Sequence, residues 1–362
     1  MSYRRGDDAP IEHIVLNLWR SAMFARTCLL ALSLLSALLL PVQADAAPRY
    51  KVTILPERFG PVDINNAGVM AGNLAVSEAV SHAALLVRGK IIDLGTLGGP
   101  NSFANALNEA GQVTGFSTTR DPDTFHAFLY SRGRMIDIDG RPGKFSTGIG
   151  INAKGQVVGQ FVNRKNQLHA YRYAGRGLED LGTLGGDVSF GWDINDAGAV
   201  VGESVIDDPA SVPFEPFHPF VYRKGVMRDL GVLQAGRANA AQEINNAGQI
   251  AGYSEVDGAF HVFFYENGMM TDLGFFGGRQ LSVNDMNERG VFVGTAQAPG
   301  DSVSFVYAGG QLHNLDALIV SPGGWHVTAA NGINDRGQIV GGACRQTTCF
   351  SVRLDPVHGH HR

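Results

Sequence analysis

The sequence is poor in cysteine, in charge and in long apolar runs, and each shortage argues against a class of protein. Only 3 cysteines occur among 362 residues, without the second Cys pair that a structural zinc site needs. The net charge is −5, so the chain lacks the basic footprint of a nucleic-acid-binding protein. No nucleophile elbow, zinc motif or paired-carboxylate signature is present. We therefore expect no catalytic residue, no metal site and no cofactor.

The longest apolar run lies near the N-terminus and is short for a bilayer span. Thr27–Leu40 follows a positive charge and is followed by the small-x-small triplet Ala44-Asp45-Ala46. This order is typical of a secretory signal peptide, whereas the alternative, a membrane anchor, needs roughly 20 apolar residues. We expect translation to start at Met23 and residues 1–46 to be removed, leaving a secreted or periplasmic protein without a membrane span.

Two cysteines remain after that cleavage. Cys344 and Cys349 are close in sequence, in a chain expected to be exported, which predicts a disulfide across a tight hairpin. A loop this short gives only about 2 kcal/mol of stabilisation in the chain-entropy model.

After residue 50 no stretch keeps a helical spacing of apolar residues, and a short phrase recurs instead. The phrase is I-N-x-x-G-x-h-x-G, where h is apolar. A HAFLY-type segment, as at 126–130, follows the copies, and so does a segment related to DLGTLGG, which is identical at 93–99 and 180–186. The copies of the first phrase begin at Ile64, Leu107, Ile151, Ile194, Ile244, Met286 and Ile333.

Each repeat contains four short extended segments rich in Val, Ile, Phe and Tyr and bounded by Gly, Asn and Asp. Seven repeats of four strands each predict an all-β fold, namely a seven-bladed β-propeller. A β-solenoid is the alternative, although its coils usually have a shorter period. The last repeat lacks its fourth strand, and Tyr50–Leu55 precedes the first repeat. We therefore expect the N- and C-terminal strands to pair and close the ring, with one propeller over 47–355 and a disordered tail at 356–362.

The repeats resemble the HAF-repeat family of bacterial proteins. His126-Ala127-Phe128 matches the HAF triplet, and both DLGTLGG copies match the second hallmark of the family. The resemblance covers nearly all of 50–355 and implies repeat architecture and an extracellular location. It implies no known chemistry and supplies no catalytic residue.

The repeated polar residues are expected to be structural. The Asn and the first Gly of I-N-x-x-G suit a hairpin in which Asn binds its own backbone and Gly adopts a positive φ. Equivalent His residues on different blades cannot converge on one metal ion, so each is expected to bond within its blade. Acid–base catalysis usually needs one positioned group, so an Asp that returns from blade to blade is expected to serve the fold. The DLGTLGG glycines are not followed by the helix that a phosphate-binding loop needs.

The residues that do not repeat are better candidates for function. In a propeller the loops after the second and fourth strands share one face, and here they vary most, as in the insert at 205–217. Exposed aromatic and charged residues in such loops are common in recognition surfaces. The candidate ligand-binding residues are Arg120, Asp121, Asp123, Arg164, Lys165, Asp207, Asp208, Phe214, Arg279, Trp325 and His326.

Two classes of function stay open. The first is a non-catalytic binding module for an extracellular glycan, cell-surface or protein ligand. The alternative is a hydrolase or lyase that acts on an extracellular polymer at the propeller mouth, for which the acids of the insert, Asp207, Asp208 and Glu215, are the best sequence hint.

Overall fold

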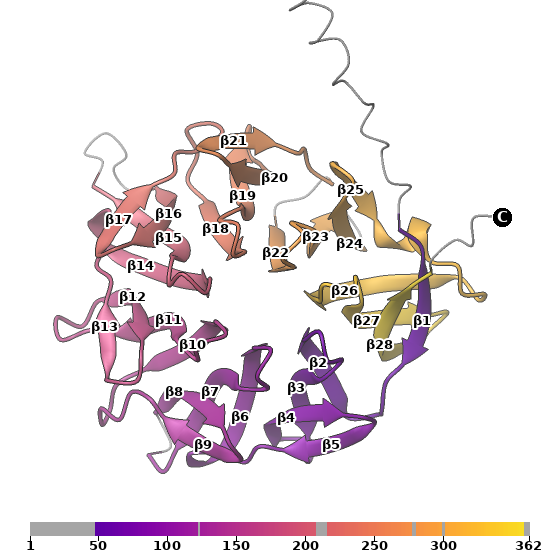
Figure 1. Cartoon of the computed structure of the whole chain (residues 1–362), viewed down its shortest axis with the longest axis horizontal. Helices are drawn as coiled ribbons and strands as arrows, with labels where there is room; N and C mark the ends of the chain where they lie inside the picture. The colour runs from indigo at the N-terminus through magenta and orange to yellow at the C-terminus, as the bar shows by residue number, and fades with distance from the viewer. Residues whose placement is uncertain (1–47, 122–123, 208–215, 277–279, 299–300, 358–362) are drawn as a thin grey trace, which may run out of the picture. The chain divides into compact units, whose positions relative to one another are not determined.

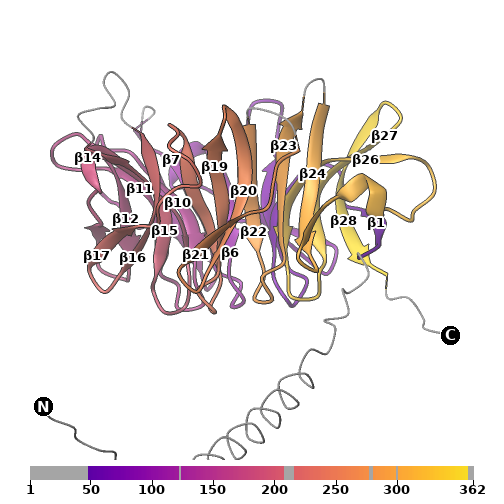
Figure 2. The same cartoon turned by 90° about the horizontal axis from the view of Figure 1, so that it is seen from above.

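The structure, a computed structural model, describes residues 48–121, 124–207, 216–276, 280–298 and 301–357. Within the unit Ala47–Arg362 the described strands form seven four-stranded antiparallel sheets. The sheets are blades set in a ring around a common centre, which is the β-propeller that the seven repeats predict (Figure 1). The strands run between two faces of connecting loops (Figure 2).

Each repeat supplies one blade, and the first strand of each blade lies nearest the centre of the ring (Figure 1). Blades 1 to 4 are β2 (Phe59–Ile64), β3 (Met70–Ala75), β4 (Ser81–Val87), β5 (Lys90–Asp93); β6 (Gly98–Leu107), β7 (Val113–Thr119), β8 (Phe125–Ser131), β9 (Arg134–Asp137); β10 (Ser146–Ile151), β11 (Val157–Val162), β12 (Leu168–Tyr173), β13 (Leu178–Asp180); and β14 (Gly185–Ile194), β15 (Val200–Ile206), β16 (Phe217–Arg223), β17 (Val226–Asp229). Blades 5 to 7 are β18 (Asn239–Ile244), β19 (Ile250–Val256), β20 (Ala259–Glu266), β21 (Met269–Asp272); β22 (Gln280–Met286), β23 (Phe292–Ala298), β24 (Asp301–Ala308), β25 (Gln311–Asn314); and β26 (Trp325–Ile333), β27 (Ile339–Arg345), β28 (Thr348–Pro356), β1 (Tyr50–Ile54).

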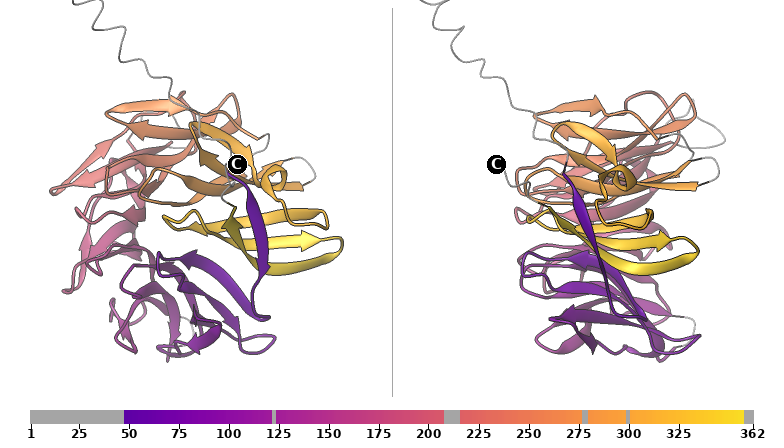
Figure 3. Two further views of the ribbon diagram at one scale, coloured as in Figure 1. Left: turned by 45° about the vertical axis from the view of Figure 1, so that its right-hand side comes forward. Right: turned by 90° about the vertical axis from the view of Figure 1, so that its right-hand side faces the viewer.

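The N-terminal strand completes the last blade, as the sequence predicts. β1 pairs antiparallel with β28, with Tyr50 opposite Pro356 and Ile54 opposite Val352 (Figure 3). The outer edge of β1 is also covered at its start, because the backbone N–H of Val320 donates to the carbonyl oxygen of Tyr50 at 2.9 Å. The two ends of the chain are thus joined by a ladder of hydrogen bonds, which removes a free edge at the seam.

The apolar core is divided among the junctions between neighbouring blades. At the junction of blades 1 and 2, for example, Leu85 belongs to one buried cluster with Val113 and Phe128. Each blade therefore meets apolar neighbours on both faces. This two-sided burial explains why the segment 83–87 is a continuous apolar run rather than an alternating one.

A β-bulge interrupts every first strand directly before its Ile-Asn, as between Gly191 and Asp193. The last Gly of the repeated phrase makes room for it. A Cβ atom on Gly202 would lie 1.9 Å from the carbonyl oxygen of Phe190, and the equivalent glycines show 1.9 to 2.3 Å. Bulges redirect side chains, and the bulged segments line the cavity described below.

Blade 7 carries the disulfide expected from the sequence. Cys344 and Cys349 are bonded across the hairpin that joins β27 and β28. A short 3-10 helix, η2 (Leu315–Leu318), connects blade 6 to blade 7.

Candidate functional site

The asparagines of the repeated phrase form a closed ring of hydrogen bonds at the centre of the propeller. In each hairpin the side-chain oxygen accepts backbone N–H groups, as Asn152 does from Lys154 and Gln156. The glycine that closes this turn, Gly155, has φ of 71°. This confirms the predicted hairpin chemistry. The side-chain nitrogen donates to the backbone oxygen of the equivalent asparagine in the next blade, at 2.9 to 3.5 Å, around the whole set of Asn65, Asn108, Asn152, Asn195, Asn245, Asn287 and Asn334.

A cavity of about 450 Å³ lies at the same end of the ring. It is lined by the ends of the first strands and by the first hairpins of the blades, so it opens on the face opposite to the loops that the sequence favours. Among the described lining residues eight are acidic and none is Lys, Arg or His. A concave surface with charge of one sign concentrates the electrostatic field inside it. The acids are Asp63, Glu109, Asp193, Asp196, Glu243, Asp285, Glu288 and Asp335.

Four of these acids form the rim of the cavity, each directly after a repeated asparagine. They accept backbone N–H groups of neighbouring hairpins: Glu109 from Asn66 at 3.0 Å, and Glu288 from Asn246 at 3.0 Å. Asp335 accepts the N–H of Glu288 at 2.9 Å. The rim carboxylates, Glu109, Asp196, Glu288 and Asp335, therefore keep their positions while facing solvent at the mouth.

Three aspartates lie deeper, at the bulges, and each links two blades. Asp63 accepts the N–H of Ile64 in its own blade and the N–H of Leu107 in blade 2, at 2.5 and 2.6 Å. Asp193 binds Ile244 of blade 5 at 3.0 Å in the same way, and Asp285 binds Ile333 of blade 7 at 2.6 Å. These hydrogen bonds hold the inner ends of neighbouring blades together.

The fourth deep acid, Glu243, has a different partner. Its carboxyl group interacts with the carboxyl group of Asp193, which lies in the next blade and lines the same cavity. Burial, together with the carboxylates of Asp193, Asp285 and Asp63, raises the pKa of Glu243 well above its usual range. Glu243 therefore keeps its proton to a higher pH than a free carboxyl group does.

The three aspartates are also harder to ionise than free carboxyl groups. Burial raises the pKa of Asp63 and of Asp193 to about 6, although backbone N–H groups favour the charged form of each. Burial and the Asp63 carboxylate raise the pKa of Asp285 well above its usual range. The deep part of the cavity thus holds carboxyl groups that ionise at higher pH than free carboxyl groups do.

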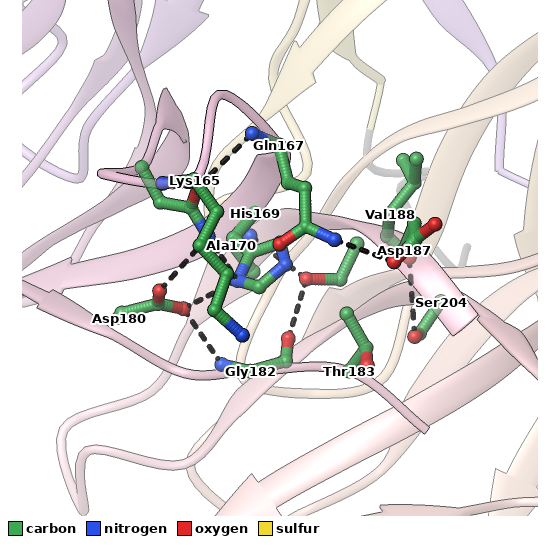
Figure 4. Close-up of polar contacts among 12 residues, drawn as sticks. Lys165, Gln167, His169, Ala170, Asp180, Gly182, Thr183, Asp187, Val188 and Ser204 are labelled. Atoms are coloured by element: carbon green, nitrogen blue, oxygen red, sulfur yellow. Dashed lines mark hydrogen bonds and ion pairs between the residues drawn. The ribbon is translucent and has the colours of Figure 1, made fainter. Parts of the chain in front are cut away.

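The recurring His and Asp residues pair inside their own blades, away from the cavity. In blade 3 the Nδ1 atom of His169 lies 2.7 Å from Asp180, and Gly182 donates its N–H to the same carboxylate at 2.9 Å (Figure 4). The equivalent distances lie between 2.7 and 2.9 Å in the pairs His82–Asp93, His126–Asp137, His218–Asp229 and His261–Asp272. The expectation of bonding within each blade is confirmed.

The DLGTLGG heptad is the step from one blade to the next. After Asp180 and Gly182, the N–H of Leu184 donates to the hydroxyl of Ser204 in blade 4 at 2.9 Å. The hydroxyl of Ser189, also in blade 4, donates back to the carbonyl of Gly182 at 2.6 Å. The repeated heptad is thus accounted for by contacts between blades.

Several sequence-predicted site residues lie on the other face of the ring. Arg120, Arg164, Lys165 and Asp207 are exposed in the loops after the second strands of blades 2, 3 and 4. Asp121 accepts the hydroxyl of Thr124 within its own loop at 2.8 Å. These residues therefore lie in corresponding loops of neighbouring blades on one face of the ring. None of them lines the cavity. Asp123, Asp208, Phe214 and Arg279 lie outside the described residues.

The sequence suggested that Trp325 and His326 lie in a loop, and this prediction is wrong. They begin β26 and pair with Arg345 and Cys344 of β27. The guanidinium of Arg345 lies 5.2 Å from the centre of the Trp325 ring. His326 binds Asp316 of η2 at 2.7 Å. The Trp325 ring therefore contacts its own blade, whereas His326 joins blade 7 to the helix that connects it to blade 6.

The described residues contain no group of three or more His, Cys, Asp or Glu arranged to hold a metal ion. None of the helices in the described part of the chain has the length and apolar character needed to cross a bilayer.

No family model matches the chain, and no curated protein matches it. Solved structures do share the fold. The β-propeller domain of the Trilobed protease from Pyrococcus furiosus, described as having an open velcro topology, matches with a TM-score of 0.54 at 9% identity, over 87% of this chain and 99% of that one. An acylaminoacyl peptidase from Pyrococcus horikoshii matches with a TM-score of 0.51 at 9% identity, over 83% of this chain and 53% of that one. An oligogalacturonate lyase from Vibrio parahaemolyticus matches with a TM-score of 0.49 at 10% identity, over 87% of this chain and 92% of that one. At such identities the two matches with TM-scores above 0.5 show the fold alone.

The sequence does contain a signal for the deep acids. They occupy the residue before Ile-Asn or Met-Asn in blades 1, 4, 5 and 6, where the other blades have Ala106, Gly150 and Gly332. This position, one residue before the end of the first strand, thus holds either an acid or a very small residue. This contrast within an otherwise regular repeat is what could have identified the cavity.

Proposed function

We propose that this protein is an exported, non-catalytic binding module whose acidic cavity receives a positively charged group of its ligand. The observation that carries this proposal is the cavity lining, with eight carboxyl groups and no described cationic side chain. A preformed concave site with converging polar groups is the usual place for a ligand. A basic protein segment complements this charge better than a neutral glycan does.

Export is supported by two features. The N-terminal sequence has the order of a signal peptide, and the Cys344–Cys349 disulfide is typical of proteins that work outside the cytoplasm. The resemblance to the HAF-repeat family agrees with the same location.

The proposal is tested with pentalysine and, as a neutral probe of equal length, pentaalanine, in low salt at pH 7.5. Pentalysine is expected to bind and pentaalanine is not. Glu109→Gln and Glu288→Gln, which keep an acceptor oxygen, should each weaken binding about threefold, as expected for a partly exposed charge pair. Glu78→Gln, in an exposed loop on the other face, should change nothing. Absence of pentalysine binding, or an equal effect of Glu78→Gln, would contradict the proposal.

One observation favours the alternative, an extracellular polymer hydrolase or lyase. Asp193 and Glu243 are interacting carboxyl groups inside the cavity, and paired carboxyls with raised pKa values are used in acid–base catalysis. A screen of polymer hydrolase and lyase substrates would support this alternative if it found turnover that Asp193→Asn removed. Turnover that the Asp207/Asp208 double substitution removed would instead place chemistry on the opposite face.

A further inference from the structure

The deep carboxyl groups face one another across the ring centre without a compensating cation. Asp63 lies on β2, Asp193 on β14, Glu243 on β18 and Asp285 on β22, and all four line the same cavity. Besides burial, the negative charges of Asp193 and Glu109 raise the pKa of Asp63, and the charge of Glu288 raises that of Asp193. In the same way the three deep aspartates raise the pKa of Glu243, and Asp63 and Asp193 raise that of Asp285. Among the described residues that line the cavity the remaining polar side chains are neutral, apart from Asp196 and Asp335 at the rim. Lys154, a described cation at the rim, donates to the backbone oxygen of Asp196 at 2.6 Å and not to a deep carboxyl group. The repulsion within this group is therefore relieved by protons or by a cation that enters the cavity.

Asp193 and Glu243 lie at equivalent bulges of neighbouring blades and line the same cavity, so their carboxyl groups favour retention of a proton. An ionised carboxylate can only accept hydrogen bonds, so two carboxyl groups bind each other only when one of them is protonated. The Asp193 oxygens already accept the N–H groups of Ile194 and Ile244, which favours its ionised form. Glu243, whose carboxyl accepts no backbone N–H among the described residues, is therefore the more readily protonated of the two.

We propose that Asp63, Asp193, Glu243 and Asp285 form a proton-controlled switch at the ring centre. In mildly acidic medium the group is largely neutral and the blades are held tightly. As the medium becomes neutral the group gains negative charge, which weakens the ring and raises the affinity of the cavity for a cation. The ligand half of this statement rests on the proposed function, whereas the stability half does not.

The direction of the pH effect follows from linkage. All four pKa values are raised in the folded protein, so folding takes up protons above pH ~4, where the carboxyl groups of the unfolded chain ionise. Their stabilising contribution is complete below that pH. It is lost as the pH rises through about 6 for Asp63 and Asp193, and through higher values for Glu243 and Asp285.

Two other carboxyl groups act in the opposite direction at lower pH. Burial raises the pKa of Asp137, but the hydrogen bonds from His126, Gly140 and Asp139 together outweigh it and lower this pKa. The pKa of Asp355 is lowered in the same way by several hydrogen bonds, of which that from Arg353 contributes most. Their contribution is present above the unfolded pKa of about 4 and is lost on further acidification. The highest stability is therefore expected near pH 5.

The stability half is tested by urea unfolding of the mature chain between pH 5 and pH 8, together with direct measurement of proton uptake on refolding. The unfolding free energy is expected to fall across this range. Glu243→Gln retains a donor to Asp193 but cannot ionise, so it should reduce the uptake at pH 7 by about one proton. Glu78→Gln should leave the uptake unchanged. A flat or rising pH profile, or unchanged uptake in Glu243→Gln, would overturn the switch. If Glu243→Gln does not fold, Asp285→Asn provides the same comparison.

The ligand half is tested by pentalysine binding at pH 5 and pH 7.5, since lysine stays charged at both. Binding is expected to be about tenfold weaker at pH 5, with a smaller ratio in Asp193→Asn, because Asp193 ionises between these two pH values. No binding at either pH would contradict the proposed function, while the uptake measurement would still decide the stability half. Equal binding at both pH values, with normal proton uptake, would overturn only the ligand half of the switch.

Discussion

At the scale of single residues, the repeated asparagine has two separate tasks. Its side-chain oxygen shapes the hairpin, which is a local task, and its side-chain nitrogen reaches the next blade, as from Asn152 to the carbonyl of Asn195 at 2.9 Å. A buried amide whose oxygen and nitrogen both form hydrogen bonds is costly to replace. Its former partners would stay buried without either a hydrogen bond or water, and each would lower the free energy of unfolding. This double use explains why each repeat has asparagine here.

Substitutions at Asn152 separate the two tasks. Asn152→Asp keeps the oxygen that accepts from Lys154 and Gln156 but, when ionised, has no donor for Asn195. At pH 7.5 we expect Asn152→Asp to lower the unfolding free energy by about 2 kcal/mol and Asn152→Ala by about 3 kcal/mol, measured by urea denaturation. If Asn152→Asp were as stable as the unsubstituted protein, the hydrogen bond between blades would have no energetic role.

At the scale of elements, blade 7 differs from the five blades that carry a His–Asp pair. Register places Phe350 where those blades have His and Ile54 where they have Asp. In blade 7 the hairpin is tied by the Cys344–Cys349 disulfide, and the outer strand comes from the other end of the chain. The blade that closes the ring thus has a covalent link and an outer strand from the N-terminus in place of the His–Asp pair.

The closing strand depends on Tyr50, whose side chain is only 2% exposed and packs in the cluster between blades 6 and 7. Tyr50→Ala should lower the unfolding free energy by about 4 kcal/mol, because it empties a large buried site. Lys51→Ala is the matched control, since Lys51 is exposed on the same strand, and should change stability by less than about 0.5 kcal/mol. Thermal and urea unfolding measure both. Equal effects of the two substitutions would show that β1 does not hold the ring closed.

At the scale of the whole molecule, closure should make the seven blades behave as one unit. Every blade shares its apolar core with two neighbours, and the asparagine ring passes through all of them. An open array of repeats, in contrast, could lose its terminal units independently.

Limited proteolysis of the mature protein should therefore yield one resistant core from about residue 50 to 355, with a single cooperative unfolding transition. Cleavage in exposed loops of the face opposite the cavity should nick this core without releasing single blades. A ladder of fragments that differ by one repeat length would indicate independent repeats and contradict closure.

The sequence by itself determined the architecture. The number of blades, the strands in each, the pairing of the two ends and the structural role of the repeated Asn, Gly, His and Asp all follow from a local pattern that returns seven times. Such features are predictable because each blade repeats the same short-range interactions. Where one copy of the pattern is weak, the other copies still show which strand or turn belongs there.

Only the tertiary structure decided where the candidate site lies. Asp63 and Asp285 are more than two hundred residues apart and meet because the ring closes and the bulges direct the deep acids toward its centre. Likewise, Trp325 and His326 look like free recognition residues until Arg345 and Asp316 are seen beside them. Periodicity shows which residues are equivalent among the blades, whereas contacts among residues that differ depend on how the blades are assembled in space.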